Sequence, residues 1–541
     1  MIDPLSRLAI LYGTDKFGLH DYTPNYHRLL RHLRKEPIAM LEIGVGGYAD
    51  PKAGGSSLEV WRDYFPHGRI IGIDIAAKSL DLGPRVNLAQ GSQVDPAFLE
   101  DLVTQHGPFD IILDDGSHRN EHVVESYRLL FQAVKPGGFY IVEDVQTAVF
   151  PRFGGSLELT APNTIGLFSD LMAAVVSGAR EAAEIQTLFR FHNIVGVRKT
   201  GGVVLPPEVD PVKVLPAYAA DAAISEALAP LEDGARIAVE GPVSETLRRR
   251  FLEVDHREIA VNFPATDISD QARTVFALYA ERGQVLLEKG QNNYPSNFDF
   301  DAENPQARAA LDAFKQVLWE TPTESGLQVY GTIAERAGWS ETCLEIAARL
   351  KTLSVTNSGS YQFLARTAKK NGQLAELQMI LEAAIAKFPD DPGFAGQFAM
   401  HLVSQGHVEQ AEDVIYKARD AGADSADLSM RMALIQMRLG HLDTALAEAQ
   451  DATAKKPKMT AGWITLARVH ATRKDWEAVE KACVTGISKT TNQQAALLEL
   501  LSQARLALED ADGARAAIEQ GLRAAPNHPR LLRLRSALDA G

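Results

Sequence analysis

The chain has 541 residues, of which 45% are hydrophobic and 23% are charged, and its formal net charge is -15. This length exceeds one hydrophobic core, so we expect about two to four domains. The acidic balance, without a run rich in lysine and arginine, argues against nucleic acid as the main partner. No apolar run reaches the length of a membrane span, and the first residues lack the order of a secretory signal.

Cysteine is rare in the chain. Cys343 and Cys483 are the only two, and they stand far apart. This usage is typical of a reduced compartment and predicts a cytoplasmic protein. Both residues are expected to serve as small packing groups.

The first forty residues contain an unusual cluster of polar and aromatic side chains between Tyr12 and Tyr26, followed by a short predicted helix over 26–34. So many hydrogen-bonding groups near a terminus favour a lid over a ligand. The alternative is a helix that packs on the edge of a sheet through its tyrosines.

A predicted strand over 38–43 ends in a glycine-rich turn that follows Glu42 and contains Gly44 and Gly46. Glycine allows the backbone to turn sharply and to approach a ligand closely. The next predicted strand, 69–74, ends in Asp74, where a carboxylate can accept hydrogen bonds from ribose hydroxyls. The pattern therefore predicts a nucleoside site in a Rossmann-like α/β fold.

The class of nucleoside follows from what the glycine turn lacks. The G-x-G-x-x-G spacing of pyrophosphate-binding dinucleotide folds is absent, and Glu42 would repel a pyrophosphate. S-adenosylmethionine suits this turn better. Gln93 and Asp95 follow the third predicted strand, where an adenine edge could be bound, although they could instead cap the helix expected over 96–105.

Acidic residues end two further buried strands. The strand at 109–114 leads into Asp114, Asp115 and His118, and the strand at 139–144 ends in Glu143 and Asp144. Carboxylates that meet at one sheet edge repel each other unless something positive lies between them, so the sequence predicts a divalent metal. Carboxylate ligands without a cysteine or a histidine pair favour magnesium over zinc. The alternative is that Asp114 and Asp144 only cap the helices that follow.

These residue types fit methyl transfer from a sulfonium to a hydroxyl group. Magnesium held by carboxylates can bind adjacent sugar oxygens and lower the pKa of the hydroxyl group. A histidine within hydrogen-bond reach, here His118, can accept the proton near neutral pH.

Several motifs, in order, resemble the metal-dependent class I methyltransferases that O-methylate antibiotic sugars, such as the mycinamicin and tetracenomycin rhamnosyl O-methyltransferases. The motifs are Glu-Ile-Gly-Val-Gly-Gly-Tyr (42–48), Gly-Gly-Ser-Ser-Leu (54–58), Phe-Asp-Ile-Ile-Leu-Asp-Asp-Gly-Ser-His (109–118), Pro-Gly-Gly-Phe-Tyr-Ile-Val-Glu-Asp (136–144) and Phe-Gly-Gly (153–155). The resemblance extends from about residue 12 to 155 and more weakly to 202.

The resemblance implies a role for individual positions. It implies Asp115, Glu143 and Asp144 as magnesium ligands and His118 as general base. Other positions fall in the family's cofactor-binding or lid segments, namely Asp74, Gln93 and Asp95 for the cofactor and Asp15 and Lys16 for the lid.

The next part of the chain is less regular. A helix is expected over 164–177 and one reversed strand over 187–199, which closes the first domain near Gly202. Beyond it we expect short strands at 236–239 and 258–261, a helix over 243–254 and an irregular connection at 291–305. No chemistry is assigned to this part.

From about residue 324 the sequence repeats. Small or medium-sized residues recur at a spacing of 34 residues, and once of 35. A second series of small residues stands twelve positions before the first. The two series are Cys343, Leu377, Ala411, Ala445, Val479 and Ala514, and Gly331, Ala365, Ala399, Ala433, Ala467 and Ser502. This helix-turn-helix period resembles the tetratricopeptide repeat and predicts a solenoid of about six repeats.

The sequence thus predicts a multidomain chain: an α/β Rossmann-like methyltransferase domain with an N-terminal lid (1–202), a poorly defined connecting region (203–322) and an all-α solenoid (323–541). The expected function is O-methylation of a sugar on a glycan or glycosylated metabolite, with a protein partner on the solenoid and a possible homo-oligomer. The alternatives are a repeat scaffold whose methyltransferase domain is inactive or secondary, and a catechol-type O-methyltransferase.

Overall fold

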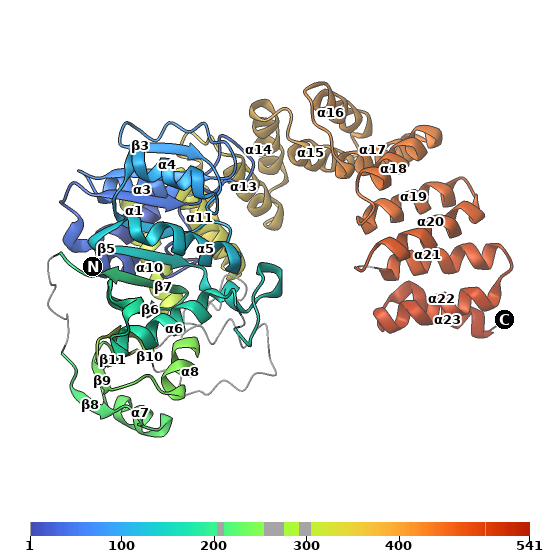
Figure 1. The fold of residues 1–541 in the computed structure, drawn as a ribbon. Helices are drawn as coiled ribbons and strands as arrows, with labels where there is room; N and C mark the ends of the chain where they lie inside the picture. The colour runs from blue at the N-terminus through green and yellow to red at the C-terminus, as the bar shows by residue number, and fades with distance from the viewer. Residues whose placement is uncertain are drawn as a thin grey trace. The chain divides into compact units, whose positions relative to one another are not determined.

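The computed structural model describes residues 2–159, 161–202, 210–253, 275–290, 305–492 and 494–540 (Figure 1). The chain forms two compact units, Met1–Ser354 and Val355–Gly541. The predicted domain boundaries at 202 and 322 both lie inside the first unit, so the three-part division stays a prediction.

The first unit contains an 11-stranded sheet in the order β3-β2-β1-β4-β5-β7-β6-β10-β11-β9-β8. Five strands form its parallel part: β1 (Ala39–Ile43), β2 (Arg69–Asp74), β3 (Val86–Gln90), β4 (Phe109–Asp114) and β5 (Val134–Glu143). Six strands complete it: β6 (Ile185–Phe191), β7 (Ile194–Lys199), β8 (Lys213–Pro216), β9 (Arg236–Glu240), β10 (Val275–Glu281) and β11 (Gln284–Lys289).

The parallel part has the order of a doubly wound α/β fold. β1 pairs with β2 on one side and with β4 on the other. The strand order therefore runs outward from β1 through β2 and β3 in one direction and through β4 and β5 in the other. Ligands bind in such sheets at the carboxyl ends of the strands where the order reverses. The predicted α/β fold is confirmed, and it points to the crevice above β1 and β4.

Helices cover both faces of the sheet because alternate strand residues point to opposite sides. Leu41 and Ile112 pack in one core, and Met40 and Ile111 pack in the other. The first core also receives residues of α4 (Pro96–His106), α5 (Asn120–Leu130), α6 (Thr164–Ser177), α7 (Asp221–Leu228) and α8 (Glu245–Glu253). The second receives residues of α1 (Pro4–Tyr12), α2 (Thr23–Leu30) and α3 (Ser56–Tyr64).

The antiparallel part of the sheet differs from expectation. The single reversed strand expected over 187–199 is wrong: β6 and β7 form a hairpin, because Asn193 adopts a left-handed φ of 57° and turns the chain. The region after 202 adds β8 to β11 to the same sheet. β9 and α8 correspond to the strand at 236–239 and the helix at 243–254, whereas the strand at 258–261 lies outside the described residues.

The helical array confirms the 34-residue period. Its paired helices are α11 (Glu324–Arg336) and α12 (Ser340–Leu350), α13 (Ser358–Lys370) and α14 (Leu374–Lys387), α15 (Pro392–Ser404) and α16 (Val408–Asp420), α17 (Ala426–Leu439) and α18 (Leu442–Lys455), α19 (Thr460–Thr472) and α20 (Trp476–Lys489), and α21 (Gln494–Ala507) and α22 (Ala511–Ala524). A helix precedes them, α10 (Pro305–Glu320), and another follows, α23 (Pro529–Ala540).

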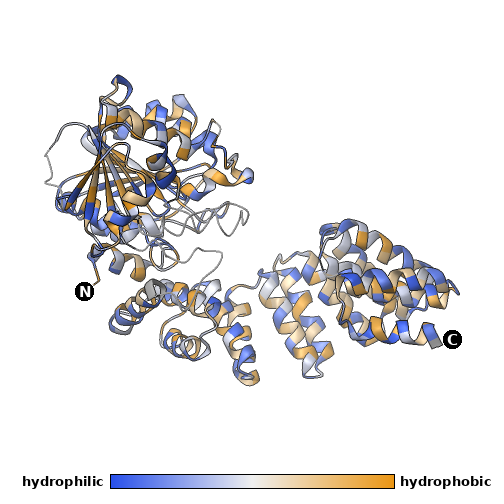
Figure 2. Cartoon of the chain, turned by 90° about the horizontal axis from the view of Figure 1, so that it is seen from below, coloured by the Kyte–Doolittle hydropathy of each residue, from blue (hydrophilic) through white to orange (hydrophobic). Residues whose placement is uncertain are grey.

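Burial explains the repeated residues of this array. Both predicted series are buried, one on the first helix and one on the second helix of every pair. Gly338, Gly372, Gly406 and Gly440 have positive φ angles at the turns within pairs. Helices of the array show an apolar and a polar side, whereas the strands of the sheet are apolar along most of their length (Figure 2).

Within the part of the chain that the structure describes, no helix combines the length and apolarity needed to cross a membrane. Both cysteines are buried thiols, as expected for packing residues, and burial raises the pKa of Cys483 to about 12.

Candidate functional site

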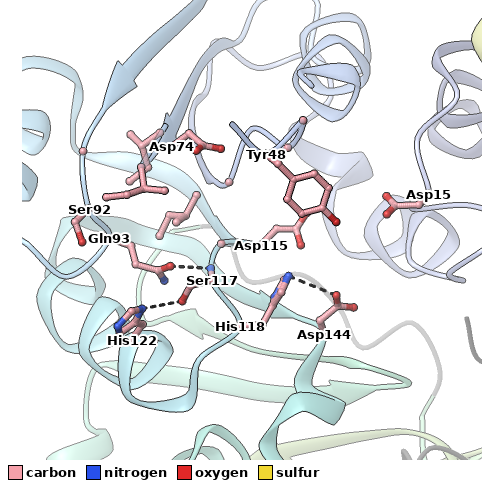
Figure 3. Close-up of a pocket in the computed structure, with 18 of the residues that line it drawn as sticks. Asp15, Tyr48, Asp74, Ser92, Gln93, Asp115, Ser117, His118, His122 and Asp144 are labelled. Carbon is pink, nitrogen blue, oxygen red and sulfur yellow. Dashed lines mark hydrogen bonds and ion pairs between the residues drawn. The ribbon is translucent and has the colours of Figure 1, made fainter. Parts of the chain in front are cut away.

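A cavity of about 630 Å³ opens at the carboxyl edge of the parallel strands (Figure 3). Its walls come from the turns after β1, β2, β3, β4 and β5, from α5 and from the N-terminal segment before α2. Seven predicted site residues are among those that line it: Gly44, Gly46, Asp74, Gln93, Asp115, His118 and Asp144.

The glycine turn lets two loops of the cavity touch. Gly44 has a φ of +96°, and a Cβ placed on it would lie 2.2 Å from the backbone oxygen of Asp115. Any other residue would therefore push the loop after β1 away from the loop after β4. The turn thus brings two loops into close contact, and the predicted close approach to a ligand stays a prediction.

Asp74 ends β2 and faces the same cavity (Figure 3). One carboxylate oxygen accepts the backbone N–H of Val45 at 3.1 Å, and the other accepts that of Ala76 at 2.8 Å. A carboxylate oxygen has two lone pairs, so each retains capacity for a ligand hydroxyl. This position fits the predicted ribose contact.

Gln93 and Asp95 make different contacts. Gln93 donates to Asp114 at 3.1 Å and to Ser126 at 2.9 Å, and its oxygen accepts the N–H of Ser117 at 2.9 Å. Its side chain thus supports the loop that carries His118. Asp95 caps α4 instead, so the capping alternative describes Asp95 and not Gln93.

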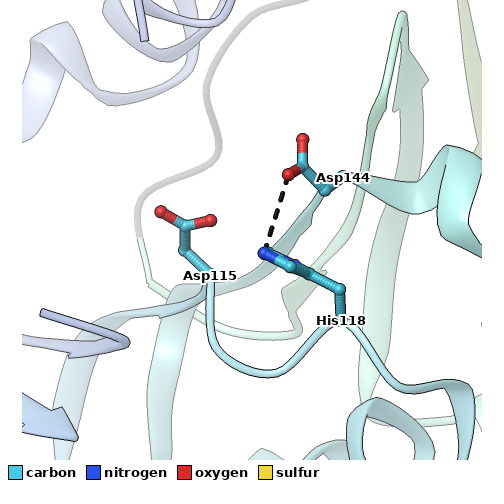
Figure 4. Close-up of side chains that lie close together, drawn as sticks. All are labelled: Asp115, His118 and Asp144. Carbon is cyan, nitrogen blue, oxygen red and sulfur yellow. Dashed lines mark ion pairs between the residues drawn. The ribbon is translucent and has the colours of Figure 1, made fainter. Parts of the chain in front are cut away.

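Three potential metal ligands come together in the cavity. Asp115, His118 and Asp144 each offer one ligand atom, and these atoms lie within 4.8 Å of one another (Figure 4). His118 Nε2 lies 3.6 Å from Asp144 Oδ2. His118 and Asp144 also have positive φ angles, 56° and 53°, a strained conformation that clusters at functional sites. Two carboxylates and an imidazole can bind a divalent cation.

Glu143, the third predicted magnesium ligand, is bound differently. Its carboxylate accepts from Lys16 Nζ at 2.6 Å and from the hydroxyl of Tyr26 at 2.7 Å. It is not among the residues that line the cavity, and it is absent from the three-residue cluster of the described chain. Its role as a metal ligand stays a prediction.

Lys16 supplies a positive charge among the acids. Its ammonium lies 2.7 Å from Asp115, 2.6 Å from Glu143 and 3.7 Å from Glu42, and it is almost fully buried. Burial lowers the pKa of Lys16, but Asp115, Glu143 and Glu42 raise it well above its usual value. The repulsion from which a metal was predicted is therefore relieved in part by a lysine.

Strand geometry explains this grouping. Glu42 shares the face of Met40, and Glu143 shares that of Ile141, so both point under the N-terminal segment and away from the cavity. Asp114 has the opposite parity and lies beside Gln93 on the other face. The period-two alternation could have separated these acids from the sequence alone. Lys16 was expected only in the lid, and nothing local in the sequence indicated it as a partner of the acids.

Tyrosines tie the N-terminal segment to the acids. Tyr22 donates to Asp144 at 2.5 Å, and Asn193 donates to the same oxygen at 3.1 Å. Both Tyr22 and Tyr26 are buried. The segment therefore packs on the sheet through its tyrosines, as the alternative held, and it also contributes Asp15 and His20 to the cavity wall.

Charge and burial shift several pKa values. Burial raises the pKa of Glu42 to about 7 although Lys16 opposes the shift, and burial raises that of Asp114 to about 6. Burial also acts to raise the pKa of Asp144, but His20 and His118 hold it below its usual value. Asp144 thus remains ionised beside His118, which suits a carboxylate that binds cations.

Sequence reasoning gave no role to Tyr48 or His122, which both line the cavity. Tyr48 has a φ of 48° and is 94% exposed, and His122 Nδ1 is 2.9 Å from Ser117 Oγ. An aromatic residue directly after a glycine turn was a usable signal for Tyr48. His122 stands within α5 and gave none.

No family model matches the chain. Its N-terminal third is similar to sugar O-methyltransferases, as the motifs implied. It is 44% identical over 168 residues to 8-demethyl-8-alpha-L-rhamnosyl tetracenomycin-C 2'-O-methyltransferase of Streptomyces olivaceus, covering 31% of this chain and 44% of that protein. It is 45% identical over 174 residues to mycinamicin VI 2''-O-methyltransferase of Micromonospora griseorubida, covering 32% and 44%.

Demethylmacrocin O-methyltransferase of Streptomyces fradiae is 48% identical over 152 residues, covering 28% of this chain and 38% of that protein. A solved structure of the MycE methyltransferase from the mycinamycin biosynthetic pathway, in complex with Mg and SAH, is 41% identical, with a TM-score of 0.35, and covers 38% of this chain and 58% of that one. The chain spans less than half the length of the curated relatives named here.

Proposed function

We propose that the first unit is an O-methyltransferase that moves a methyl group from S-adenosylmethionine to a sugar hydroxyl. One observation carries the proposal: a single cavity at the switch point between β1 and β4 combines Asp74 with the cluster of Asp115, His118 and Asp144. A carboxylate that can accept hydrogen bonds from a ribose thus lies in the same cavity as two carboxylates that can bind a cation and a histidine that can accept a proton. Identity of 44–48% to named sugar O-methyltransferases over the N-terminal third of the chain supports this chemistry.

The cofactor side of the cavity is formed by Gly44, Gly46 and Asp74. The glycines allow close backbone approach, and the Asp74 carboxylate would accept hydrogen bonds from ribose hydroxyls. Glu42 acts indirectly, since its side chain lies on the other face of β1 beside Lys16. Asp95 and Asp114 support the neighbouring helix and loop.

The acceptor side would hold magnesium. The Asp115 and Asp144 carboxylates, which reach the cavity next to His118, would bind the ion, with Glu143 behind them. A bound magnesium ion supplies charge that orients sugar oxygens and lowers the pKa of a hydroxyl group. Oxygen-rich sites of this kind suit magnesium.

His118 is our proposed general base. It lies on the loop after β4, which Gln93 anchors through the N–H of Ser117, and Asp144 lies beside its Nε2. The ionised Asp144 stabilises the imidazolium that forms when His118 accepts a proton from the acceptor hydroxyl. The ring of Phe153, 6.4 Å from that of His118, adds an apolar wall beside the base.

The acceptor would be a sugar on a glycan or a glycosylated metabolite, and the enzyme would act in the cytoplasm. The helical array would recruit a protein partner, as stacked helix pairs commonly do. Six such pairs in register favour a binding surface and keep a repeat scaffold as the second candidate function.

Isothermal titration of S-adenosylmethionine, with and without magnesium, tests the proposal. We expect cofactor binding in both titrations and transfer of labelled methyl to sugars of a cell glycan extract only with magnesium. Absence of cofactor binding would favour the scaffold. Transfer that persists after chelation would remove the metal, and transfer to catechols alone would replace the sugar acceptor.

A further inference from the structure

The N-terminal segment that delivers Lys16 does not rest on the sheet alone. Helices α10 and α11 of the same unit lie against it, more than 290 residues later in the chain (Figure 1). The rings of Phe17 and Phe314 are 5.7 Å apart between centroids. Phe314 is fully buried in α10, where its ring also stacks on Tyr330 of α11 at 5.5 Å.

Glycines make this contact close. A Cβ on Gly18 would lie 2.3 Å from the ring of Phe314, and one on Gly13 would lie 2.5 Å from the backbone of Ser325. From the other side, Gly326 of α11 presses on the backbone oxygen of Ile10, which a Cβ would approach to 2.3 Å. Thr323 donates to the backbone oxygen of Leu11 at 2.6 Å. Residues 10–18 are therefore held by helices α10 and α11 through backbone and ring contacts.

Lys16 lies inside this held segment. Its backbone oxygen accepts the N–H groups of Tyr22 and Thr23 at 3.1 and 3.2 Å, which closes a compact loop. Its ammonium group donates to Asp115 and Glu143, whereas the ring of Phe17 packs on Phe314. Two adjacent residues thus join the first helices of the array to the acids of the site.

We propose that Phe314 is a positioning residue for the active site: by packing on Phe17 it fixes the loop from which Lys16 reaches Asp115 and Glu143. Lys16 in turn sets the orientation of Asp115, one of the acids that face the cavity. Its catalytic consequence rests on the proposed function. The contact itself does not, because the geometry of residues 10–18 can be measured without any reaction.

The physical reason is the cost of leaving the loop unsupported. The ammonium group of Lys16 stays between the two carboxylates only if the backbone of its loop is fixed. If the loop moves away, the ammonium group and the carboxylates are left as buried charges without partners. A cavity in place of the Phe314 ring would release Phe17 and let the loop open. Helices α10 and α11 therefore belong to the support of the site, although they stand at the start of the helical array.

The test uses the full-length chain with Phe314→Ala and hydrogen exchange of segment 13–23. We expect the amides of His20 and Tyr22, which are bonded within the segment, and that of Thr14, which is bonded to Ala9 of α1, to exchange at least about tenfold faster. The matched control is Phe394→Ala in α15, an equally buried phenylalanine that stacks on Phe388 in the array. This control should leave exchange in the segment within about twofold of wild type.

Catalysis gives the second measurement. Phe314→Ala should lower kcat about tenfold while cofactor affinity changes less than about twofold, because Gly44 and Asp74 are not moved. Lys16→Met should lower kcat at least as much. If Phe314 acts through Lys16, adding Phe314→Ala to Lys16→Met should cost less than about a further twofold.

Each outcome decides the proposal. Segment exchange equal to that of the control, or losses in kcat that multiply in the double variant, would overturn it. If Phe314→Ala does not fold, the same exchange measurement is made on Phe17→Ala and Phe314→Leu. Phe17→Ala should exchange faster in the segment, and Phe314→Leu should retain most of the wild-type protection. If wild type transfers no methyl group, the proposed function fails, and the exchange arm still decides whether Phe314 holds the segment.

Discussion

Several charged side chains are buried at the carboxyl edge of the parallel strands, whereas most of those in the helical array remain in contact with water. At the sheet edge Lys16, Glu42 and Glu143 are buried and share one another as partners. In the array, pairs such as Arg419 with Glu448, which are 2.7 Å apart and partly exposed, join α16 to α18, the second helices of neighbouring pairs. Burying a charge costs free energy of folding, so we expect buried charges where the chemistry needs them. Ion pairs in contact with water add little to stability.

This difference teaches where a substitution should affect activity and where it should affect only stability. The acids at the sheet edge are held by contacts with Lys16 that extend over 99 residues of sequence to Asp115 and 127 to Glu143. The array relies on local pairs and on small buried residues at a fixed period. Loss of one charge should therefore be severe at the first place and mild at the second.

The largest effect should follow Asp115→Asn. An amide is a weaker ligand for magnesium than a carboxylate and a poorer partner for Lys16, so methyl transfer should fall by at least about a hundredfold. Cofactor affinity, measured by titration calorimetry, should stay within about threefold. Asp95→Asn is the matched control, since asparagine also caps a helix and this residue does not line the cavity. Equal losses in both variants would break the comparison.

His118→Ala should come next. Removing the proposed base should lower kcat about a hundredfold and change the KM for the sugar much less. The pH profile of kcat should also lose its acidic limb, because no imidazole then needs to be deprotonated. His67→Ala, at an exposed position outside the cavity, serves as control. A defect confined to sugar binding would remove His118 as the base.

Glu42→Gln should change how stability depends on pH. Burial raises the pKa of Glu42 to about 7, above its unfolded value, so the folded state holds this proton more tightly. Its stabilisation is complete below the unfolded pKa and is lost as the pH rises through about 7.

Glutamine cannot titrate. The stability of wild type relative to Glu42→Gln should therefore decrease by about 1 to 3 kcal/mol between pH 5 and pH 8. Thermal unfolding of the first unit at several pH values measures it. A difference that stays constant, or that grows with pH, would contradict a raised pKa.

The smallest effect is expected in the array. Arg419→Met should remove the pair with Glu448 and cost about 1 kcal/mol or less, because both side chains retain contact with water. Its effect should shrink further in high salt. Hydrogen exchange of α16 and α18 measures it, with Glu448→Gln completing a double-mutant cycle. Methyl transfer should not change. A loss of stability larger than the one measured for Glu42→Gln would reverse the comparison.

Much of the fold was predictable because its signals are local. The apolar strand before Gly44 and the acidic ends of β4 and β5 placed the sheet edge, and the helix over Thr164–Ser177 has the bounds that were expected. The period of the array was visible because each helix pair repeats the same packing problem. In these segments propensity and burial agree.

The remainder depended on contacts between distant segments. No local feature marks Lys16 as the partner of Asp115, since 99 residues separate them. The hairpin of β6 and β7 was missed because Asn193 turns a run that otherwise looks like one strand. β8, β10 and β11 join the sheet through pairing that their own short sequences do not specify.

The contact between Thr323 and Leu11 spans 312 positions and has a consequence for how the protein is made. During synthesis the strands β1 to β5 leave the ribosome long before α10 and α11, and domains generally fold from the N-terminal side first. The segment around Lys16 must therefore wait for the chain to reach Arg336, the end of α11, before it gains its final neighbours. Closing so long a loop is slow, so the cavity would be completed late, after most of the sheet has formed.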